Sequence, residues 1–203
     1  MFLAKSPTIL KKYYSKLIWE IPNADNKIYL TFDDGPIPEI TEWVLDILQH
    51  YQIKATFFCI GDNVKKHSVI YKRILADGHA VGNHTQNHLK GWKTANQTYF
   101  KNIEECADFV QSTLFRPPYG KVKKSQYSKL IKGYKIVMWD VLSGDFDVKT
   151  SPEQCFNNVI KNTKSGSIIV FHDSIKASKN LKHVLPNAIE FLLEKGFVFD
   201  VIQ

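Results

Sequence analysis

Short runs rich in β-branched and aromatic residues alternate with amphipathic helical stretches along most of this chain. This alternation predicts a mainly parallel sheet covered by helices, because parallel strands need crossover connections. Most of the runs are continuously apolar, as expected of strands that are buried on both faces. The expected strands span residues 27–32, 55–60, 79–83, 114–116, 135–139, 167–171 and 197–202. The repeats predict one α/β domain of barrel-like or open type.

The intervening segments carry helical periodicity and capping signals. An apolar stripe predicts a helix between the first two strands, and Gly78 is expected to end the next helix in a left-handed conformation. Further helices are expected over 94–113 and 123–132. Ser151, with a proline after it and Gln154 at the third helical position, predicts a capping box. Pro186 interrupts the last apolar stripe, so that helix is expected to begin near Pro186 or to bend there.

Residues 1–26 precede the first repeat and form an N-terminal extension to a domain of residues 27–203. An apolar stripe beside lysines predicts that the extension packs on the domain, with membrane-surface binding as the alternative. No apolar run is long enough for a transmembrane helix. Lysines also break the apolar core that a signal peptide would need, which predicts a cytoplasmic or peripheral protein.

The charge balance is basic, with 27 lysines and arginines against 20 acidic residues and a net charge of +7. Such a charge suits an anionic glycan, an acidic lipid surface or nucleic acid. The lysines are scattered without a compact basic run, which argues against nucleic acid as a partner. Cys59, Cys106 and Cys155 lie far apart among apolar neighbours, so small core residues are expected rather than a disulfide framework or thiolate cluster.

Polar side chains follow the ends of several predicted strands, which is where the active sites of parallel α/β barrels form. The first group is Asp33 and Asp34, followed by a glycine and a proline. Neighbouring strand residues point in opposite directions, so one carboxylate can bind a metal while the other handles a proton. The alternative is a solvated Asp-Gly turn.

His84 and His88 are four residues apart, a spacing that on a helical turn puts two imidazoles on one face, ready for one metal ion. The pair is not the HExxH motif, because Thr85 stands where that motif has its glutamate. The general base must come from elsewhere, and Asp33 is the obvious candidate. Two histidines and a carboxylate leave positions open for water and substrate, which suits Zn²⁺ or another divalent ion. Structural histidines are the alternative.

Arg116 and His172 complete the polar set. Arg116 stands out in a lysine-rich chain, and its planar charged fork is expected to hold Asp33. After two prolines, the backbone N–H of Tyr119 is a candidate oxyanion donor. His172 follows a buried strand and can act as a general acid if Asp145 orients it, with Asp140 as the other choice. The competing interpretation is a rigid loop and a structural histidine. No serine lies in a GxSxG motif, which argues against a serine triad.

In this order, five motifs resemble those of the polysaccharide deacetylases, carbohydrate esterases that share the chitooligosaccharide deacetylase homology domain. They are TFDDGP at 31–36, HTQNH at 84–88, RPPYG at 116–120, SGDFD at 143–147 and IVFHD at 169–173. The resemblance spans residues 27–203. It implies a distorted (β/α) barrel of about seven parallel strands, in agreement with the alternation of strands and helices.

The resemblance also implies roles for residues of this chain. Asp34, His84 and His88 would bind one divalent metal, with Zn²⁺ expected first and Co²⁺, Mn²⁺ or Ni²⁺ as alternatives. Asp33, restrained by Arg116, would be the general base, and His172, oriented by Asp145, the general acid, while the Tyr119 N–H would stabilise the oxyanion. The residues expected to contact the substrate are Pro118, Tyr119, Phe146 and Val170. Phe146 and Val170 stand where many relatives have tryptophan and leucine, which bears on substrate fit.

The resemblance predicts a metal-dependent hydrolase that removes N-acetyl groups from N-acetylated sugars or polysaccharide, releasing acetate and leaving a free amine. Two alternatives remain open at this point. One is a relative that binds glycans without catalysis, and the other is an amidohydrolase acting on a different carbon–nitrogen bond. The expected partner is an N-acetylated glycan, whose identity and chain length the sequence leaves open, as it does the oligomeric state.

Overall fold

A computed structural model describes residues 2–22 and 24–203 of the chain, and within them eight strands form one sheet in which every strand pair is parallel. Seven strands follow the order β5-β4-β3-β2-β1-β7-β6, and β8 pairs with the start of β1. The strands are β1 (Lys27–Asp33), β2 (Thr56–Cys59), β3 (Ala80–Asn83), β4 (Leu114–Phe115), β5 (Lys135–Ile136), β6 (Val141–Leu142), β7 (Ile168–His172) and β8 (Val198–Phe199). The predicted parallel α/β architecture is confirmed.

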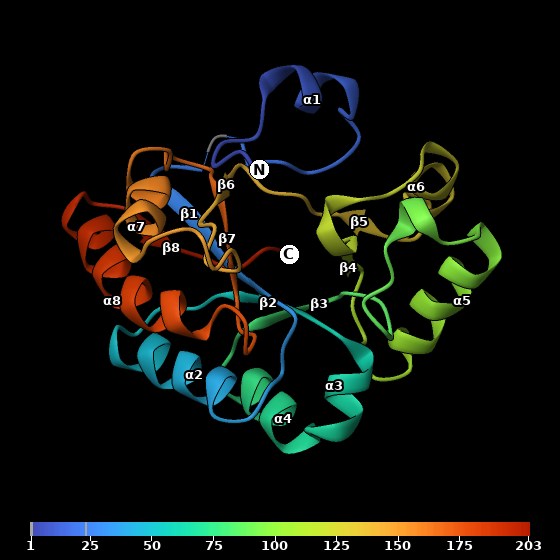
Figure 1. Ribbon diagram of the computed structural model, residues 1–203, viewed down its shortest axis with the longest axis horizontal. Helices are drawn as coiled ribbons and strands as arrows, with labels where there is room; N and C mark the ends of the chain where they lie inside the picture. Colours follow the sequence, from blue (N-terminus) through green and yellow to red (C-terminus); the bar gives the residue numbers. More distant parts are fainter. Residues whose placement is uncertain (1, 23) are drawn as a thin grey trace.

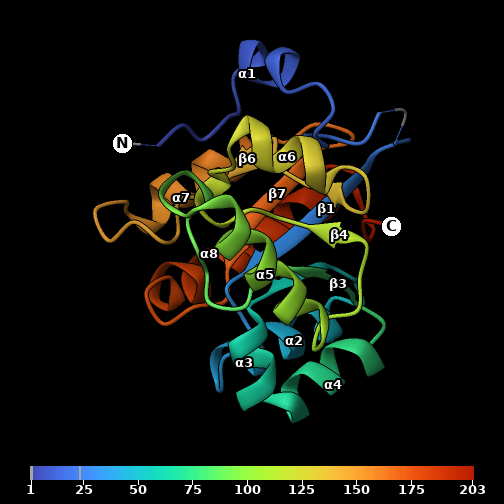
Figure 2. The same ribbon diagram turned by 90° about the vertical axis from the view of Figure 1, so that its right-hand side faces the viewer.

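The helices surround the sheet as an outer layer in both views of the chain (Figure 1 and Figure 2). They are α1 (Thr8–Tyr13), α2 (Ile40–His50), α3 (Gly61–Lys66), α4 (Ser68–Ala76), α5 (Asn96–Ala107), α6 (Lys124–Leu130), α7 (Pro152–Ile160) and α8 (Ser178–Glu194), with short 3₁₀ turns at Gly91–Lys93 and Pro118–Gly120. The largest apolar cluster lies between the strands and α2, α4, α7 and α8. A smaller one unites Tyr29, Phe58, Leu114, Val137 and Ile168, which come from different parts of the sheet. The sheet is therefore curled, as a distorted barrel requires.

The edge strands of this sheet are β5 and β6, and the N-terminal segment contacts the chain beside both of them. Ile18 forms a parallel bridge to Val137, and Lys5 forms an antiparallel bridge to Val141. Asp140 lies in the chain between β5 and β6, and its carboxylate is fully buried. It accepts hydrogen bonds from Lys5 Nζ at 2.8 Å, from Ser167 Oγ at 2.7 Å and from the Lys11 ammonium. Lysines of the N-terminal segment thus neutralise a charge of the barrel.

Several element boundaries differ from the sequence expectation. The segment before Gly78 forms two helices that meet at His67, although Gly78 adopts the expected positive φ of 78°. The helix expected over 94–113 ends at Ala107, and the strand expected over 135–139 ends at Ile136, while β6 was not predicted. Ser151 Oγ accepts from the Gln154 N–H, which confirms the N-cap.

The expected helix start near Pro186 is wrong, because α8 runs from Ser178 to Glu194 with Pro186 inside it. The apolar stripe continues on both sides of the proline, and all of its members are buried against the sheet. They are Leu181, Val184, Leu185, Ala188, Ile189 and Leu192. This burial outweighs the hydrogen bond that a proline removes from a helix. None of the helices in the described ranges is long and apolar enough to cross a membrane.

His79 gives the fold a predictable pH dependence. Its ring is 7% exposed, and its Nδ1 accepts a hydrogen bond from the Ala55 N–H at 3.2 Å. Burial, assisted by Lys54, lowers the pKa of His79 to about 4. As the pH falls below about 6.5, His79 of the unfolded chain is protonated while His79 of the folded chain stays neutral. The free energy of unfolding therefore decreases by up to about 3 kcal/mol by about pH 4.

Urea unfolding of the wild type and of His79→Gln, each at about pH 7.5 and about pH 4.5, measures this loss. The free energy of unfolding should fall by about 2 kcal/mol more in the wild type than in the variant between these two values. Equal losses in the two proteins would contradict the assignment to His79.

Candidate active site

The predicted polar residues gather at the carboxyl edge of the sheet because the strands are parallel and in register. Asp33 ends β1 and lies beside His172, which ends β7. Asn83 ends β3 and pairs with Phe115 at the end of β4. His84 and Arg116 are the next residues on those two strands, so four distant parts of the sequence meet at one place.

Asp34, His84 and His88 present three potential metal ligands to one point. Their donor atoms all lie within 4.8 Å of one another. Asp34 Oδ1 is 3.2 Å from His88 Nε2 and 3.7 Å from His84 Nε2. This oxygen is buried and has no hydrogen-bond partner among the described residues, so a cation would satisfy it. Two nitrogens and one oxygen at this spacing fit a divalent transition metal.

The segment from His84 to His88 is a loop, so the expected helical turn is wrong. Thr85 and His88 have positive φ values of 64° and 56°, which an α-helix does not allow. The Asn83 side chain holds this loop, accepting from the Thr85 N–H at 2.8 Å and donating to Ile103 O at 2.9 Å. The two imidazoles converge all the same, with ring centroids 5.1 Å apart. A loop with two positive φ values, and not the spacing of a helix, therefore brings the two imidazoles together.

The orientation of His84 allows its imidazole to bind a metal in the neutral form. Its Nδ1 lies 2.7 Å from the carbonyl oxygen of Arg116, to which Nδ1–H can donate. Burial lowers the pKa of His84 to about 4, against the opposing attraction of Asp33. The imidazole is therefore neutral near pH 7, and its Nε2 lone pair faces Asp34 and His88. Such a second hydrogen bond is the usual way in which a metal-binding histidine is oriented.

Asp33 forms a buried ion pair with Arg116, as predicted. Arg116 is 0% exposed, and its Nη1 donates to Asp33 Oδ1 at 2.7 Å and to Thr31 Oγ1 at 2.7 Å. Nη2 donates to Met138 O at 2.9 Å, and the guanidinium lies 4.0 Å above the Phe58 ring. Burial alone would raise the pKa of Asp33, but Arg116 and the two nearby histidines lower it below its ordinary value. Asp33 is thus ionised and held in one orientation.

His172 contacts Asp145 and not Asp140, the other candidate partner. Its Nδ1 lies 2.8 Å from Asp145 Oδ1, and its backbone N–H donates to Asp145 Oδ2 at 2.7 Å. Ser143 Oγ also donates to Asp145 Oδ1 at 2.9 Å. Burial would lower the pKa of His172, but Asp145 overcomes it and raises the pKa to about 9. His172 is therefore cationic near pH 7 and carries a proton that it could donate.

The predicted substrate-contact residues differ in exposure. Tyr119 has a φ of 60° and is 57% exposed, and its ring lies 4.6 Å from that of His88. Phe146 lies edge-on to His172 with ring centroids 5.0 Å apart. Val170, in contrast, is 0% exposed because β7 is covered on both faces, and Pro118 is buried as well. Contact of Val170 and Pro118 with the substrate therefore stays a prediction, since neither side chain is exposed in this structure.

Asp173 is a residue of the site to which the sequence assigned no role. Its Oδ1 accepts from the Gly35 N–H at 3.0 Å, and its Oδ2 accepts from Thr41 Oγ1 at 2.6 Å. Burial raises the pKa of Asp173 to about 8. A Cβ on Gly35 would lie 1.9 Å from Asp173 Oδ2, so this contact requires glycine after Asp34. Its place directly after His172 was the signal available in the sequence.

Because Asp173 holds the turn that carries Asp34, we expect it to act as a positioning residue for the metal ligands. Asp173→Ala should weaken Zn²⁺ binding by up to about 10- to 100-fold, the range seen when outer hydrogen bonds that orient metal ligands are lost, because the turn that carries Asp34 loses its bond at Gly35. Asp173→Asn keeps an acceptor for the Gly35 N–H and should bind within about threefold of the wild type. Competition with a chelating dye measures both. Wild-type affinity in Asp173→Ala would contradict this role.

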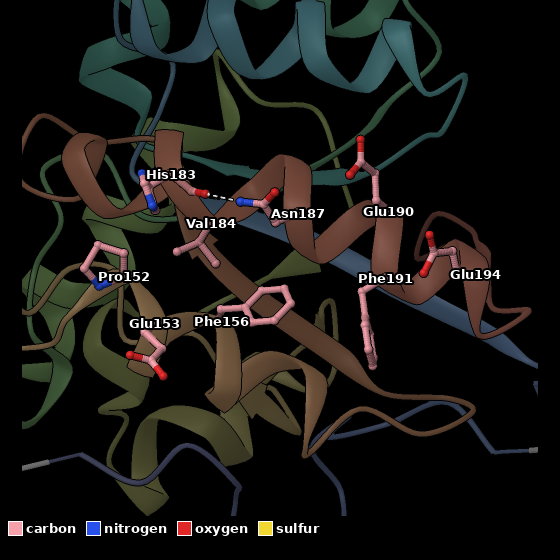
Figure 3. A pocket seen from close by; sticks show the side chains of 9 residues that line it. All are labelled: Pro152, Glu153, Phe156, His183, Val184, Asn187, Glu190, Phe191 and Glu194. Carbon is pink, nitrogen blue, oxygen red and sulfur yellow. Dashed lines mark hydrogen bonds between the residues drawn. The ribbon is translucent and has the colours of Figure 1, made fainter.

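A separate surface groove of about 420 Å³ lies between α7 and α8 (Figure 3). Its lining combines phenylalanines with glutamates: Pro152, Glu153, Phe156, His183, Val184, Asn187, Glu190, Phe191 and Glu194. None of the predicted site residues is among them. The polar cluster at the carboxyl edge of the sheet, not this groove, is the candidate active site.

Comparisons with known proteins show which family this chain resembles. The polysaccharide deacetylase family model matches residues 20–136. A peptidoglycan-N-acetylglucosamine deacetylase of Bacillus cereus is 34% identical over 192 residues, which cover 91% of this chain and 90% of the relative. A chitooligosaccharide deacetylase of Azorhizobium caulinodans is 34% identical over 163 residues, which cover 75% of this chain and 76% of the relative.

The solved structures give the same relationship in three dimensions. A crystal structure of a peptidoglycan N-acetylglucosamine deacetylase superposes with a TM-score of 0.89 at 30% sequence identity, covering 97% of this chain and 95% of the other. The distorted barrel that was expected from the five motifs is thus confirmed. Family model, sequence relatives and fold all lead to one assignment: this chain belongs to the polysaccharide deacetylase family.

Proposed function

We propose that this protein hydrolyses the N-acetyl group of an N-acetylated glycan in a metal-dependent reaction, releasing acetate and leaving a free amine. The observation that carries the proposal is the meeting of three metal-donor atoms, all within 4.8 Å of one another, with an ionised Asp33 and a cationic His172. The names of the relatives in Bacillus cereus and Azorhizobium caulinodans support the same substrate class.

Asp34, His84 and His88 would hold the metal, and Zn²⁺ suits their two nitrogens and one oxygen best. A divalent ion held by these ligands would lower the pKa of a water and would polarise a carbonyl. Asp33 then accepts the proton that the attacking water loses. Arg116 keeps Asp33 ionised and aimed, since its Nη1 contacts Asp33 Oδ1 at 2.7 Å and leaves the other carboxylate oxygen free of that bond.

Protonation of the departing nitrogen completes the reaction. Hydroxide adds to the acetyl carbon, the C–N bond breaks, and His172 donates its proton to the amine that leaves. Asp145 holds the His172 ring through Nδ1, so the Nε2–H is the proton available to the substrate. The ring of Tyr119 lies 4.6 Å from that of His88, and we assign to the backbone N–H of Tyr119 a hydrogen bond to the developing oxyanion.

A substrate panel tests the proposal. Zn²⁺-loaded protein should release acetate from N-acetylglucosamine oligomers or peptidoglycan, and much more slowly from simple acetamides that lack a sugar. Faster turnover of the simple acetamides would favour an amidohydrolase with another substrate. Tight binding of the oligomers without acetate release, with any divalent metal, would favour a glycan-binding protein without catalysis.

A further inference from the structure

The N-terminal segment reaches the candidate active site, and we propose that Phe2 is a positioning residue for substrate binding there. Phe2 holds the ring of Phe146 in place beside His172, and the Phe146 ring forms the apolar side of the pocket that receives the N-acetylated sugar. The proposal rests on the proposed function and adds to it a residue that lies outside all five motifs.

Backbone pairing brings Phe2 to this end of the barrel. The segment runs antiparallel to β6, with the Leu142 N–H donating to Ala4 O at 2.9 Å and the Ser6 N–H donating to Asp140 O at 3.0 Å. Since β6 points toward the carboxyl edge of the sheet, an antiparallel neighbour places its first residues at that edge. Residues 4–6 accordingly lie beside β6, where Figure 1 draws the first part of the chain in blue.

Side chains fix the same register. Lys5 Nζ lies 2.8 Å from the buried Asp140 Oδ2 and donates to Asn162 O at 2.6 Å. Ser6 Oγ donates to Trp139 O at 2.6 Å. A slip by one residue would turn Lys5 away from Asp140 and leave that carboxylate without this partner, so the position of Phe2 is well determined.

Three aromatic rings then lie in a row from the N-terminus to the proton donor. The ring centroids of Phe2 and Phe146 are 5.3 Å apart at an interplanar angle of 55°. Phe146 in turn lies edge-on to His172, with centroids 5.0 Å apart. Phe2 also covers Gly144, which has a φ of 82° and at which a Cβ would meet Phe2 Cζ at 2.2 Å. Gly144 directly precedes Asp145, the partner of His172.

This arrangement limits the movement of Phe146 on the side where its ring meets that of Phe2. Without the Phe2 ring, Phe146 would be free to rotate into the space above Gly144, and the apolar side of the pocket would open. An N-acetyl sugar presents a methyl group and C–H bonds, which an aromatic ring next to His172 can contact. The expected consequence is weaker substrate binding with little change in the chemical step.

Phe2→Ala tests the proposal beside Leu3→Ala, a matched control because Leu3 is the next residue and is 61% exposed. With Zn²⁺-loaded protein and N-acetylglucosamine oligomers, KM of Phe2→Ala should rise about three- to tenfold while kcat stays within about twofold. Phe2→Tyr should restore the wild-type KM. Leu3→Ala should match the wild type, and Zn²⁺ affinity should be equal in all four proteins.

Equal KM values for Phe2→Ala, Leu3→Ala and the wild type would overturn the role of Phe2 and leave the proposed function intact. If the wild type releases no acetate, the proposed function fails. The role of Phe2 in binding is then tested by measuring the affinity for the oligomers by calorimetry. A loss of affinity confined to Phe2→Ala would support the proposal. Equal affinity, or no binding by the wild type, would overturn it.

Discussion

Replacing Asp33 by asparagine is expected to lower the rate of acetate release by about 10²- to 10⁴-fold, the usual contribution of a general base. Asparagine has nearly the same shape and can still accept the hydrogen bond that Arg116 donates at 2.7 Å. It cannot take a proton from water at neutral pH. Since Asp34, His84 and His88 are untouched, Zn²⁺ affinity should stay within a few-fold of the wild type.

Steady-state acetate release and Zn²⁺ titration of the same preparations measure the two quantities. Asp46→Asn is the control, because Asp46 is an exposed carboxylate on α2 that pairs with Arg73. It should keep wild-type turnover. A value of kcat in Asp33→Asn close to that of the wild type would show that a group other than Asp33 accepts the proton of the attacking water. A parallel loss of metal binding would show instead that Asp33 belongs to the metal ligands.

Replacing Arg116 by methionine is expected to cause the largest loss of stability, about 3–5 kcal/mol, because it leaves Asp33 as a buried charge without its partner. Asp33 is 4% exposed. For a chain of this size, that loss lowers Tm by about 6–20 °C. Removing Arg116 also lets burial raise the pKa of Asp33, so the loss should shrink as the pH falls toward the ordinary aspartate pKa of about 3.9 and Asp33 takes up a proton.

Arg73→Met is the matched control, since Arg73 is the other arginine of the chain and its ion pairs with Asp46 and Asp77 lie near the surface. It should cost less than about 1 kcal/mol. The double variant Asp33→Asn/Arg116→Met should lose less stability in urea than the sum of its single variants, because it removes both charges. Additive losses, or an Arg116→Met variant as stable as Arg73→Met, would contradict the buried ion pair.

The sequence predicted the place of the site because apolar runs mark parallel strands, and parallel strands end at one edge. Asp33 and His172 needed no further information, since each directly ends its strand. The spacing of His84 and His88 was misleading, because four residues bring two side chains together on a helix and also in a loop with two positive φ values. Only backbone geometry distinguishes the two.

Other features could not be predicted from the sequence because they depend on contacts between residues that are far apart in the chain. The partner of His172 is Asp145 because Asp140 lies at the other end of β7, where its N–H donates to Ile168 O and its carboxylate binds Lys5 and Lys11. The same lysines belong to residues 1–26, the N-terminal extension that the sequence predicts to pack on the domain. The strand β6 has only two residues, too few for any periodicity, and part of its pairing comes from that segment.

The dependence of acetate release on bound metal tests the central claim most directly. Metal-stripped protein, titrated with Zn²⁺ in the presence of N-acetylglucosamine oligomers, should gain activity in proportion to the added ion. Activity should reach a plateau at about one equivalent per chain, since Asp34, His84 and His88 form one site. Full acetate release by the stripped protein, or none after one equivalent has bound, would contradict the account.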